Sequence, residues 1–204
     1  MNKIRTLIVG LGRIGKIHLT NLLARDEVQV IGVCDPTNDA KVISNKMGLT
    51  FYQKNYADIV NEIQTDAIVI CSPTDTHANY VSLAAKRGID VFCEKPLDLS
   101  LEKVKQVLKT VNESKIKLML GFNRRFDSEF QSIKEKLVKG EIGDIHMIKI
   151  TSRDPSPPPI NYIKTSGGIF LDMTIHDFDM IRYLTNKEIV EVYAKGNALI
   201  NPEI

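Results

Sequence analysis

The stretch Ile-Arg-Thr-Leu-Ile-Val-Gly-Leu-Gly-Arg-Ile-Gly, residues 4–15, places a G-x-G-x-x-G motif directly after an apolar run. The run predicts a buried strand, and the motif opens a helical pattern, which is the context that a dinucleotide-binding turn requires. In that context Gly10 permits a tight turn and Gly12 lets a pyrophosphate approach the backbone. Gly15 allows close packing of helix and strand. The stretch therefore predicts phosphate binding at a helix N-terminus, and the alternative is a glycine turn without a ligand.

Working outward, short runs rich in Ile and Val alternate with helical patterns through residue 122, which is typical of βαβ units and a parallel sheet. The runs cover residues 4–9, 28–34, 67–71, 90–93 and 117–120. The helical patterns cover residues 14–25, 39–46, 56–63, 75–87 and 101–112. Asp75 and Ser100 are the expected N-caps, because a short side-chain oxygen accepts an unpaired backbone N–H. Residues 1–122 are predicted to form an α/β Rossmann domain with a doubly wound parallel sheet.

The pattern changes after Gly121, so we expect a domain boundary near residues 121–126. A helix over 127–139, a strand over 145–153, a proline-containing loop, a second helix and a strand over 189–198 follow. Residues 123–204 are predicted to be the N-terminal part of an incomplete α+β domain for substrate binding and oligomerisation. Two strands alone would leave open sheet edges, which makes such a domain marginally stable.

Composition restricts the class of protein. The 204 residues hold 27 Lys and Arg against 25 Asp and Glu, a net charge of +2, and the basic residues are scattered. No nucleic-acid or membrane partner is expected from this pattern. The N-terminus lacks the features of a signal peptide, and the three cysteines, Cys34, Cys71 and Cys93, lack metal-ligand spacing. We expect reduced thiols and a cytoplasmic location.

The ends of the second and third apolar runs carry further candidate cofactor residues. Asp35 lies 20 residues after Gly15, the separation expected of the acid that binds a ribose 2′-hydroxyl. Such a carboxylate repels a 2′-phosphate, and no arginine stands beside it, so NAD is favoured over NADP. Ser72 and Thr74 follow a strand at its carboxyl end, where ligands bind in open α/β sheets. His77 in the same segment is interpreted as a structural or capping residue, whereas His18 and His146 suggest no role.

The helix that follows Gly167 and Gly168 carries candidate catalytic residues. At about 100° per residue, one stripe holds the polar side chains and the opposite face packs. The polar set is Asp172, His176, Asp179 and Tyr183, and the packed set is Phe178, Ile181 and Leu184. A neutral histidine is a proton acceptor near neutral pH, and a carboxylate four residues earlier can orient its ring. The alternatives are a solvated helix face and a zinc site built from Asp172, His176 and Asp179; Asp177 is expected to pair with backbone or an arginine.

Glu94-Lys95-Pro96 closes the run over 90–93. A lysine at the carboxyl end of a strand can project over the crevice that receives a nicotinamide, and the proline restricts the backbone and permits a cis bond. The alternative is an ordinary surface lysine beside a turn.

Together these motifs resemble the glucose-fructose oxidoreductase, inositol dehydrogenase and MocA family of NAD(P)-dependent oxidoreductases, and within it the inositol 2-dehydrogenases. The resemblance rests on Gly-Leu-Gly-Arg-Ile-Gly-Lys-Ile-His from Gly10, Ser-Pro-Thr-Asp-Thr-His from Ser72, Glu-Lys-Pro-Leu from Glu94, Gly-Phe-Asn-Arg-Arg-Phe-Asp from Gly121, Ser-Arg-Asp-Pro from Ser152 and Gly-Gly-Ile-Phe-Leu-Asp-Met-Thr-Ile-His-Asp-Phe-Asp from Gly167. It implies catalytic roles for Lys95, Asp172 and His176 and substrate contacts for Arg125, Arg153 and Asp154. The cofactor set is Gly10, Gly12, Arg13, Ile14, Gly15, Asp35, Ser72, Thr74, Glu94 and Lys95, with NAD as cofactor and no metal.

The implied reaction is NAD-dependent oxidation of a secondary hydroxyl of a cyclic polyol, with myo-inositol giving the 2-keto inosose. His176 would accept the hydroxyl proton, Lys95 would stabilise the negative charge on the oxygen, and Asp172 would orient the imidazole or bind a neighbouring hydroxyl. Two alternatives stay open: an NAD-binding fragment without turnover, and a relative that acts on another sugar or sugar acid. Family members continue beyond residue 204, and a full-length relative is expected to form a homo-oligomer.

Overall fold

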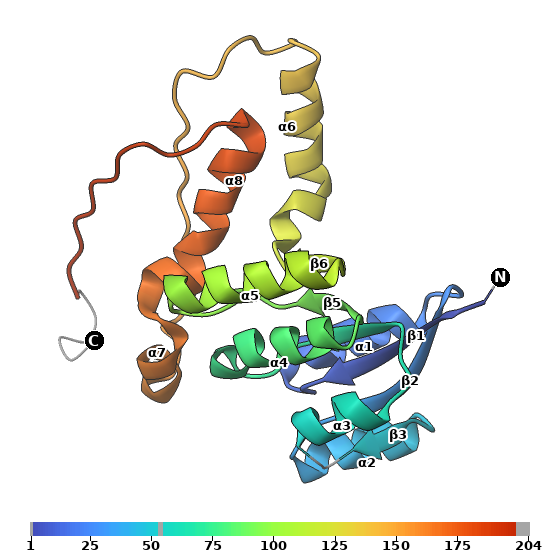
Figure 1. The fold of residues 1–204 in the computed structure, drawn as a ribbon. Coiled ribbons are helices and arrows are strands. Elements are labelled where there is room, and N and C mark those ends of the chain that lie inside the picture. The colour runs from blue at the N-terminus through green and yellow to red at the C-terminus, as the bar shows by residue number, and fades with distance from the viewer. Residues whose placement is uncertain (1, 53–54, 199–204) are drawn as a thin grey trace. The chain divides into compact units, whose positions relative to one another are not determined.

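The computed structural model describes residues 2–52 and 55–198, and the chain divides into two compact units, Met1–Gly121 and Phe122–Ile204 (Figure 1). Within the described residues no helix combines the length and apolarity needed to cross a membrane.

The first unit contains one parallel sheet with the strand order β3-β2-β1-β4-β5-β6. Its strands are β1 (Ile4–Val9), β2 (Val28–Cys34), β3 (Thr50–Tyr52), β4 (Ala67–Ile70), β5 (Asp90–Cys93) and β6 (Leu118–Leu120). The five apolar runs of the sequence all form strands. β3 was not predicted, because three residues are too short to show a period-2 pattern. The predicted doubly wound α/β sheet is confirmed.

Helices cover both faces of this sheet. Alternate strand residues point to opposite faces, so each face has its own set of apolar side chains to bury. The helices of the first unit are α1 (Arg13–Leu23), α2 (Asn38–Lys46), α3 (Tyr56–Glu62), α4 (Thr74–Lys86) and α5 (Leu101–Ser114). Leu7 and Val9 belong to the core cluster that includes residues of α3, α4 and α5, whereas Ile8 belongs to the cluster with Leu19 of α1 and Ala40 of α2. This near-continuous burial explains why the strands are apolar without alternation.

One of the two predicted N-caps is correct. Lys103 N donates to Ser100 Oγ at 3.5 Å, and Ser100 is the N-cap of α5. Asp75 is not a cap, because Pro73 holds the extended conformation before α4 and the helix begins at Thr74. A carboxylate in the first turn still interacts favourably with the helix dipole, so Asp75 suits its position for a different reason.

The regular secondary structure of the second unit, over its described residues, is helical. It contains η1 (Asn123–Phe126), α6 (Ser128–Val138), α7 (Ile160–Ser166), the π-helix η2 (Phe170–Thr174) and α8 (Ile175–Thr185). The helix predicted over 127–139 is α6, with Asp127 as its N-cap. α7 was not predicted, because the four preceding prolines suggested a loop; Pro159 instead is the N-cap from which the helix starts.

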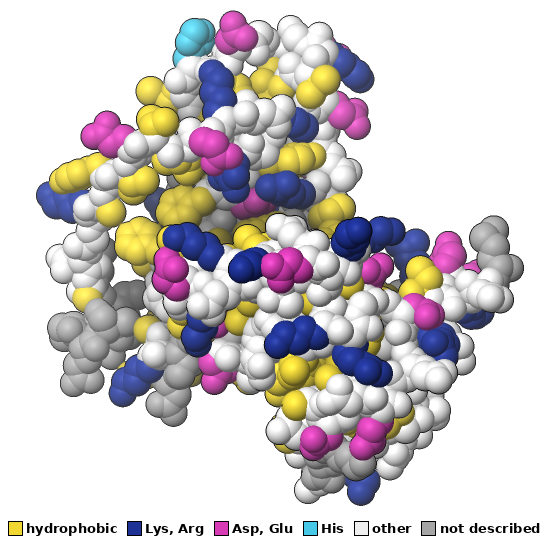
Figure 2. Space-filling model, viewed as in Figure 1, with side chains coloured by type: hydrophobic (Ala, Val, Ile, Leu, Met, Phe, Trp, Pro, Cys, Tyr) yellow, Lys and Arg dark blue, Asp and Glu magenta, His cyan; other side chains and the backbone are white. Residues whose placement is uncertain are grey.

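The strands predicted over 145–153 and 189–198 are wrong for the structure described, which has no β-pairing in either segment. A strand is stable only when its backbone N–H and C=O groups bond to a neighbour, and neither segment meets one in the described residues. Their apolar side chains are exposed: Met147 to 87% and Val190 to 98%. Figure 2 shows such hydrophobic side chains at the surface of this unit. The described residues of this unit therefore contain helices and no strand.

Candidate active site

The glycine turn after β1 has the geometry of a phosphate-binding loop. Gly10 has φ +87°, and a Cβ there would lie 2.6 Å from Ser72 N; a Cβ on Gly15 would lie 2.1 Å from Gly10 O. A Cβ on Gly12, in contrast, would meet nothing within 4 Å. Packing inside the protein therefore requires glycine at Gly10 and Gly15, and Gly12 leaves the start of α1 open to approach. That opening fits a pyrophosphate, since Gly12 provides no side-chain cap for the first-turn N–H groups.

Asp35 is held in place by the two loops around it. Leu11 N donates to Asp35 Oδ2 at 2.7 Å, and Thr37 donates to Oδ1 from its N at 2.8 Å and its Oγ1 at 2.6 Å. A carboxylate offers about four lone-pair positions, so one remains on Oδ2 to accept a hydroxyl. The carboxylate is 7% exposed and joins the glycine turn to the end of β2, the place where a ribose hydroxyl would be bound.

Ser72 and Thr74 lie at the end of β4, next to β1 in the sheet. The strand order reverses direction between β1 and β4, and ligands of open α/β sheets bind outside the carboxyl ends at such a switch point. Ser72 Oγ lies 2.6 Å from Thr76 Oγ1, and its backbone N approaches Gly10 closely. The structure thus brings this segment to the glycine turn, as the sequence predicts for residues that line a cofactor.

Glu94 and Lys95 follow β5 at the same sheet edge. Glu94 Oε1 lies 2.7 Å from His18 Nε2 of α1, and a Cβ on Gly121 would lie 2.9 Å from Glu94 Oε2. His18, for which the sequence suggested no role, therefore holds the carboxylate that precedes Lys95. The Lys95–Pro96 peptide bond is cis, as the sequence permitted.

His77 is 2% exposed, and both of its ring nitrogens lie beside backbone carbonyl oxygens. Nδ1 lies 2.7 Å from Pro96 O, and Nε2 lies 2.8 Å from Ser72 O. The interpretation of His77 as a structural residue agrees with these contacts.

All three cysteines are reduced thiols, two of them buried. Burial raises the pKa of Cys34 from 9.0 to about 12, with a further rise from the negative charge of Asp35. Burial likewise raises the pKa of Cys71 to about 12, with Glu94 adding to it, and raises that of Cys93 further still. A thiol with a raised pKa stays protonated near neutral pH, so these cysteines are poor nucleophiles.

In the second unit, the predicted helix that carries Asp172 and His176 is not a single α-helix. Asp172 lies in the π-helix η2, His176 lies in the first turn of α8, and the glycines before them have φ +86° and +76°. A π-turn contains more residues than an α-turn, so the 100° projection from Asp172 onward is incorrect. Tyr162 Oη of α7 donates to Asp172 Oδ1 at 2.8 Å, a contact that no sequence signal indicated. The His176 ring packs edge-on against Phe122, with 6.4 Å between centroids.

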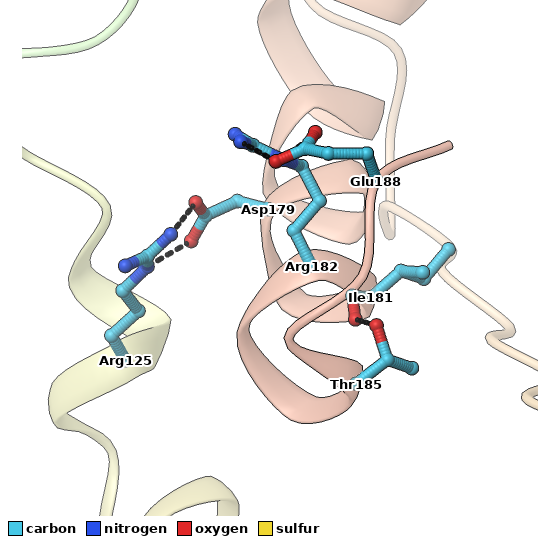
Figure 3. Close-up of polar contacts among 6 residues, drawn as sticks. All are labelled: Arg125, Asp179, Ile181, Arg182, Thr185 and Glu188. Carbon is cyan, nitrogen blue, oxygen red and sulfur yellow. Dashed lines mark hydrogen bonds and ion pairs between the residues drawn. The ribbon is translucent and has the colours of Figure 1, made fainter. Parts of the chain in front are cut away.

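The helix-face prediction is also wrong for two other side chains. Phe178, placed on the packed face, is 37% exposed, whereas Asp179, placed on the free face, is 7% exposed. Asp179 is buried because Arg125 of η1 covers it with two hydrogen bonds, Nε to Oδ2 at 2.8 Å and Nη2 to Oδ1 at 2.6 Å (Figure 3). The Asp179 bonds raise the pKa of Arg125. Its guanidinium carbon also lies 5.4 Å from the centroid of the Tyr183 ring. Asp177 pairs with Arg124, which confirms the expectation of an arginine partner.

Two remaining candidates, Arg153 and Asp154, are exposed in a segment without helix or strand. His146, for which the sequence suggested no role, is exposed as well. Substrate contacts for Arg125, Arg153 and Asp154 stay predictions. Within the described residues, no group of three or more His, Cys, Asp or Glu side chains is placed to hold a metal ion.

The sheet order, the glycine turn and the hydrogen-bonded aspartate after β2 together define the class of dinucleotide-binding α/β proteins. Comparison with known proteins narrows this class. Residues 4–122 match the family model described as "Oxidoreductase family, NAD-binding Rossmann fold", and residues 130–203 match "GFO/IDH/MocA C-terminal domain". The chain belongs to the GFO/IDH/MocA family.

Its relatives include inositol dehydrogenases. The myo-inositol 2-dehydrogenase of Thermotoga maritima is 44% identical over 97% of this chain and 59% of its own length. The inositol 2-dehydrogenase of Rhizobium meliloti is 45% identical over 98% of this chain and 61% of its own length. A crystal structure of scyllo-inositol dehydrogenase from Lactobacillus casei with bound NAD(H) and scyllo-inositol matches with a TM-score of 0.85 at 34% identity, covering 92% of this chain and 57% of that one. The chain therefore spans less than two thirds of the length of these relatives.

Proposed function

We propose that this protein takes part in the NAD-dependent oxidation of a secondary hydroxyl of a cyclic polyol, with myo-inositol as the first candidate substrate. The observation that carries the proposal is the 44–45% identity to inositol 2-dehydrogenases, which extends through both units. The cofactor site supports it, because Gly12 is open to a pyrophosphate and Asp35 has room to accept a ribose hydroxyl.

We assign the proton transfer to His176 and charge stabilisation to Lys95. When bound, NAD supplies the two-electron acceptor for the hydride that leaves the carbinol carbon. The O–H bond of the substrate breaks with its proton passing to the His176 imidazole, and the C–O bond becomes a carbonyl. The Lys95 ammonium donates a hydrogen bond to the same oxygen and stabilises its developing negative charge.

Asp172 is assigned an orienting role toward His176 or a substrate hydroxyl. Its Oδ1 accepts the hydroxyl of Tyr162, which fixes the carboxylate from the side of α7. Arg125 is firmly bound to Asp179, so we propose that it shapes the pocket, with Arg153 and Asp154 as further substrate contacts.

The test measures NAD binding by calorimetry and NADH absorbance with myo-inositol, scyllo-inositol and a panel of other sugars and sugar acids. His176→Ala is the test variant, and His146→Ala, on an exposed position of the same unit, is the matched control. We expect turnover in the wild type and in His146→Ala, and about a hundredfold loss or more in His176→Ala.

NAD binding without turnover on any substrate would contradict the proposal and favour a nucleotide-binding fragment. Turnover on a sugar acid but not on inositols would retain the reaction and change the substrate class. Equal turnover in the two histidine variants would remove His176 as the proton acceptor. We also propose a cytoplasmic location, on the ground that three cysteine thiols, two of them buried, suit a reducing compartment, and a homo-oligomeric full-length form.

A further inference from the structure

His77 joins two segments of the first unit, at Ser72 and Pro96, which lie 24 positions apart in the sequence. Its Nε2 lies 2.8 Å from the carbonyl oxygen of Ser72, after β4, and its Nδ1 lies 2.7 Å from that of Pro96, after β5. The ring is buried to 2% exposure on α4, with Pro96 and Leu97 also buried beside it. Both contacts have the length of strong hydrogen bonds.

The two contacts place the ring between carbonyl oxygens of two different segments. A backbone carbonyl only accepts a hydrogen bond, so each segment depends on the ring nitrogen that faces it. A side chain that offers an N–H at one of these two positions would keep one contact and remove the other.

The two bonds act on segments that matter for the proposed site. The Ser72 carbonyl belongs to the segment whose backbone N faces Gly10 of the glycine turn. The Pro96 carbonyl belongs to the residue directly after Lys95. On the other side of Lys95, Glu94 N donates to Ile70 O at 2.9 Å and the Glu94 carboxylate meets His18. Lys95 is therefore anchored on both sides.

We propose that His77 is a positioning residue that sets the β4 segment for cofactor binding through Ser72 and the backbone of Lys95 through Pro96. The Lys95 half of this inference rests on the proposed function. The Ser72 half requires only that the first unit binds NAD.

The test separates the two bonds with two substitutions. The amide nitrogen of asparagine occupies the position of Nδ1, and that of glutamine occupies the position of Nε2. His77→Asn therefore retains the Pro96 bond and loses the Ser72 bond, so we expect about a tenfold rise in the Kd for NAD. His77→Gln retains the Ser72 bond and loses the Pro96 bond, so we expect NAD affinity within about twofold of wild type and about a tenfold loss of kcat.

Val81→Ala is the matched control, because Val81 is fully buried on the same helix, one turn from His77, and touches neither carbonyl bond. It should lower stability without changing the Kd for NAD by more than about twofold. If His77→Asn and Val81→Ala change NAD affinity equally, or if His77→Asn and His77→Gln behave alike, the positioning role is contradicted.

If the wild type binds NAD but turns over no polyol, the proposed function fails, while the Kd values of the two His77 variants and of Val81→Ala still decide the Ser72 half of the inference.

Discussion

The two units of this chain are stabilised in different ways. The first buries two hydrophobic clusters against a six-stranded sheet, and every strand bonds to at least one neighbour. In the second, among the described residues, Met180 is the single hydrophobic side chain that is fully buried, and Asp177 and Asp179 are buried with arginine partners. Apolar burial is non-directional, whereas a buried ion pair is favourable only with both partners in place. The first unit should therefore tolerate the loss of a single charged side chain better than the second unit does.

The largest effect is expected at the glycine turn of the first unit. Gly15→Ala puts a methyl group 2.1 Å from Gly10 O, so we expect a loss of about 3 kcal/mol in the free energy of unfolding. Gly12→Ala meets no protein atom within 4 Å and should leave stability within about 0.5 kcal/mol of wild type, yet weaken NAD binding at least about tenfold. Urea denaturation and calorimetry measure both. Equal stability losses at the two positions would contradict the distinction between them.

The second unit should depend on Arg125. Arg125→Ala leaves Asp179 buried without its partner, and we expect a loss of about 2 kcal/mol, because Arg125 itself is 39% exposed and water partly replaces it. Arg182, whose partner Glu188 is exposed on the surface, is the control in Figure 3. Arg182→Ala should not change the unfolding midpoint measurably. A larger loss for Arg182→Ala than for Arg125→Ala would contradict the comparison.

The units should also differ at alkaline pH, because all cysteines lie in the first. Their folded pKa values are raised, so folding favours the protonated thiol. That stability is complete below pH 9, the ordinary pKa, and is lost as pH rises toward 12. The slope is at most about 1.4 kcal/mol per thiol and pH unit. Thermal unfolding from pH 8 to pH 11 should show a steeper decline for the wild type than for Cys34→Ala/Cys71→Ala. Parallel curves would refute the assignment to these thiols.

The smallest effects are expected at two helix C-caps with positive φ. Lys115 ends α5 with φ +57°, and Asn186 ends α8 with φ +53°. Lys115→Gly relieves the left-handed strain and should stabilise the first unit by about 0.5–1 kcal/mol. Asn186→Gly should gain less, because asparagine tolerates this conformation and Asn186 Oδ1 accepts Lys134 Nζ at 3.0 Å. Denaturant midpoints test both, and a greater gain at Asn186 would contradict this ranking.

Much of the first unit was predictable because its signals are local. Runs of Ile and Val identified five strands nearly to the residue, and G-x-G-x-x-G with Asp35 predicted where the cofactor site lies. The sequence did not predict two short elements. β3 has only three residues, and the prolines before α7 suggested a loop. The prediction was wrong about strands over 145–153 and 189–198, because pairing depends on a neighbouring strand and not on the apolar pattern of the segment itself.

Around the candidate catalytic residues, sequence reasoning identified Asp172 and His176 but misjudged their surroundings. The π-turn at Phe170–Thr174 altered the helix register. Asp179 is buried because Arg125, more than fifty residues earlier in the chain, covers it. The contacts of Tyr162 with Asp172 and of His18 with Glu94 carry no sequence signal, because they join separate elements.

By itself the sequence determined the doubly wound sheet, the glycine turn and the family, since each depends on short-range patterns that one motif or one element carries. Only the tertiary structure decided which glycines are required by packing and which is open to a ligand. It also decided that His77 lies between two carbonyl oxygens. Those properties depend on atoms brought within 3 Å from distant parts of the chain, and a residue's identity does not specify its neighbours.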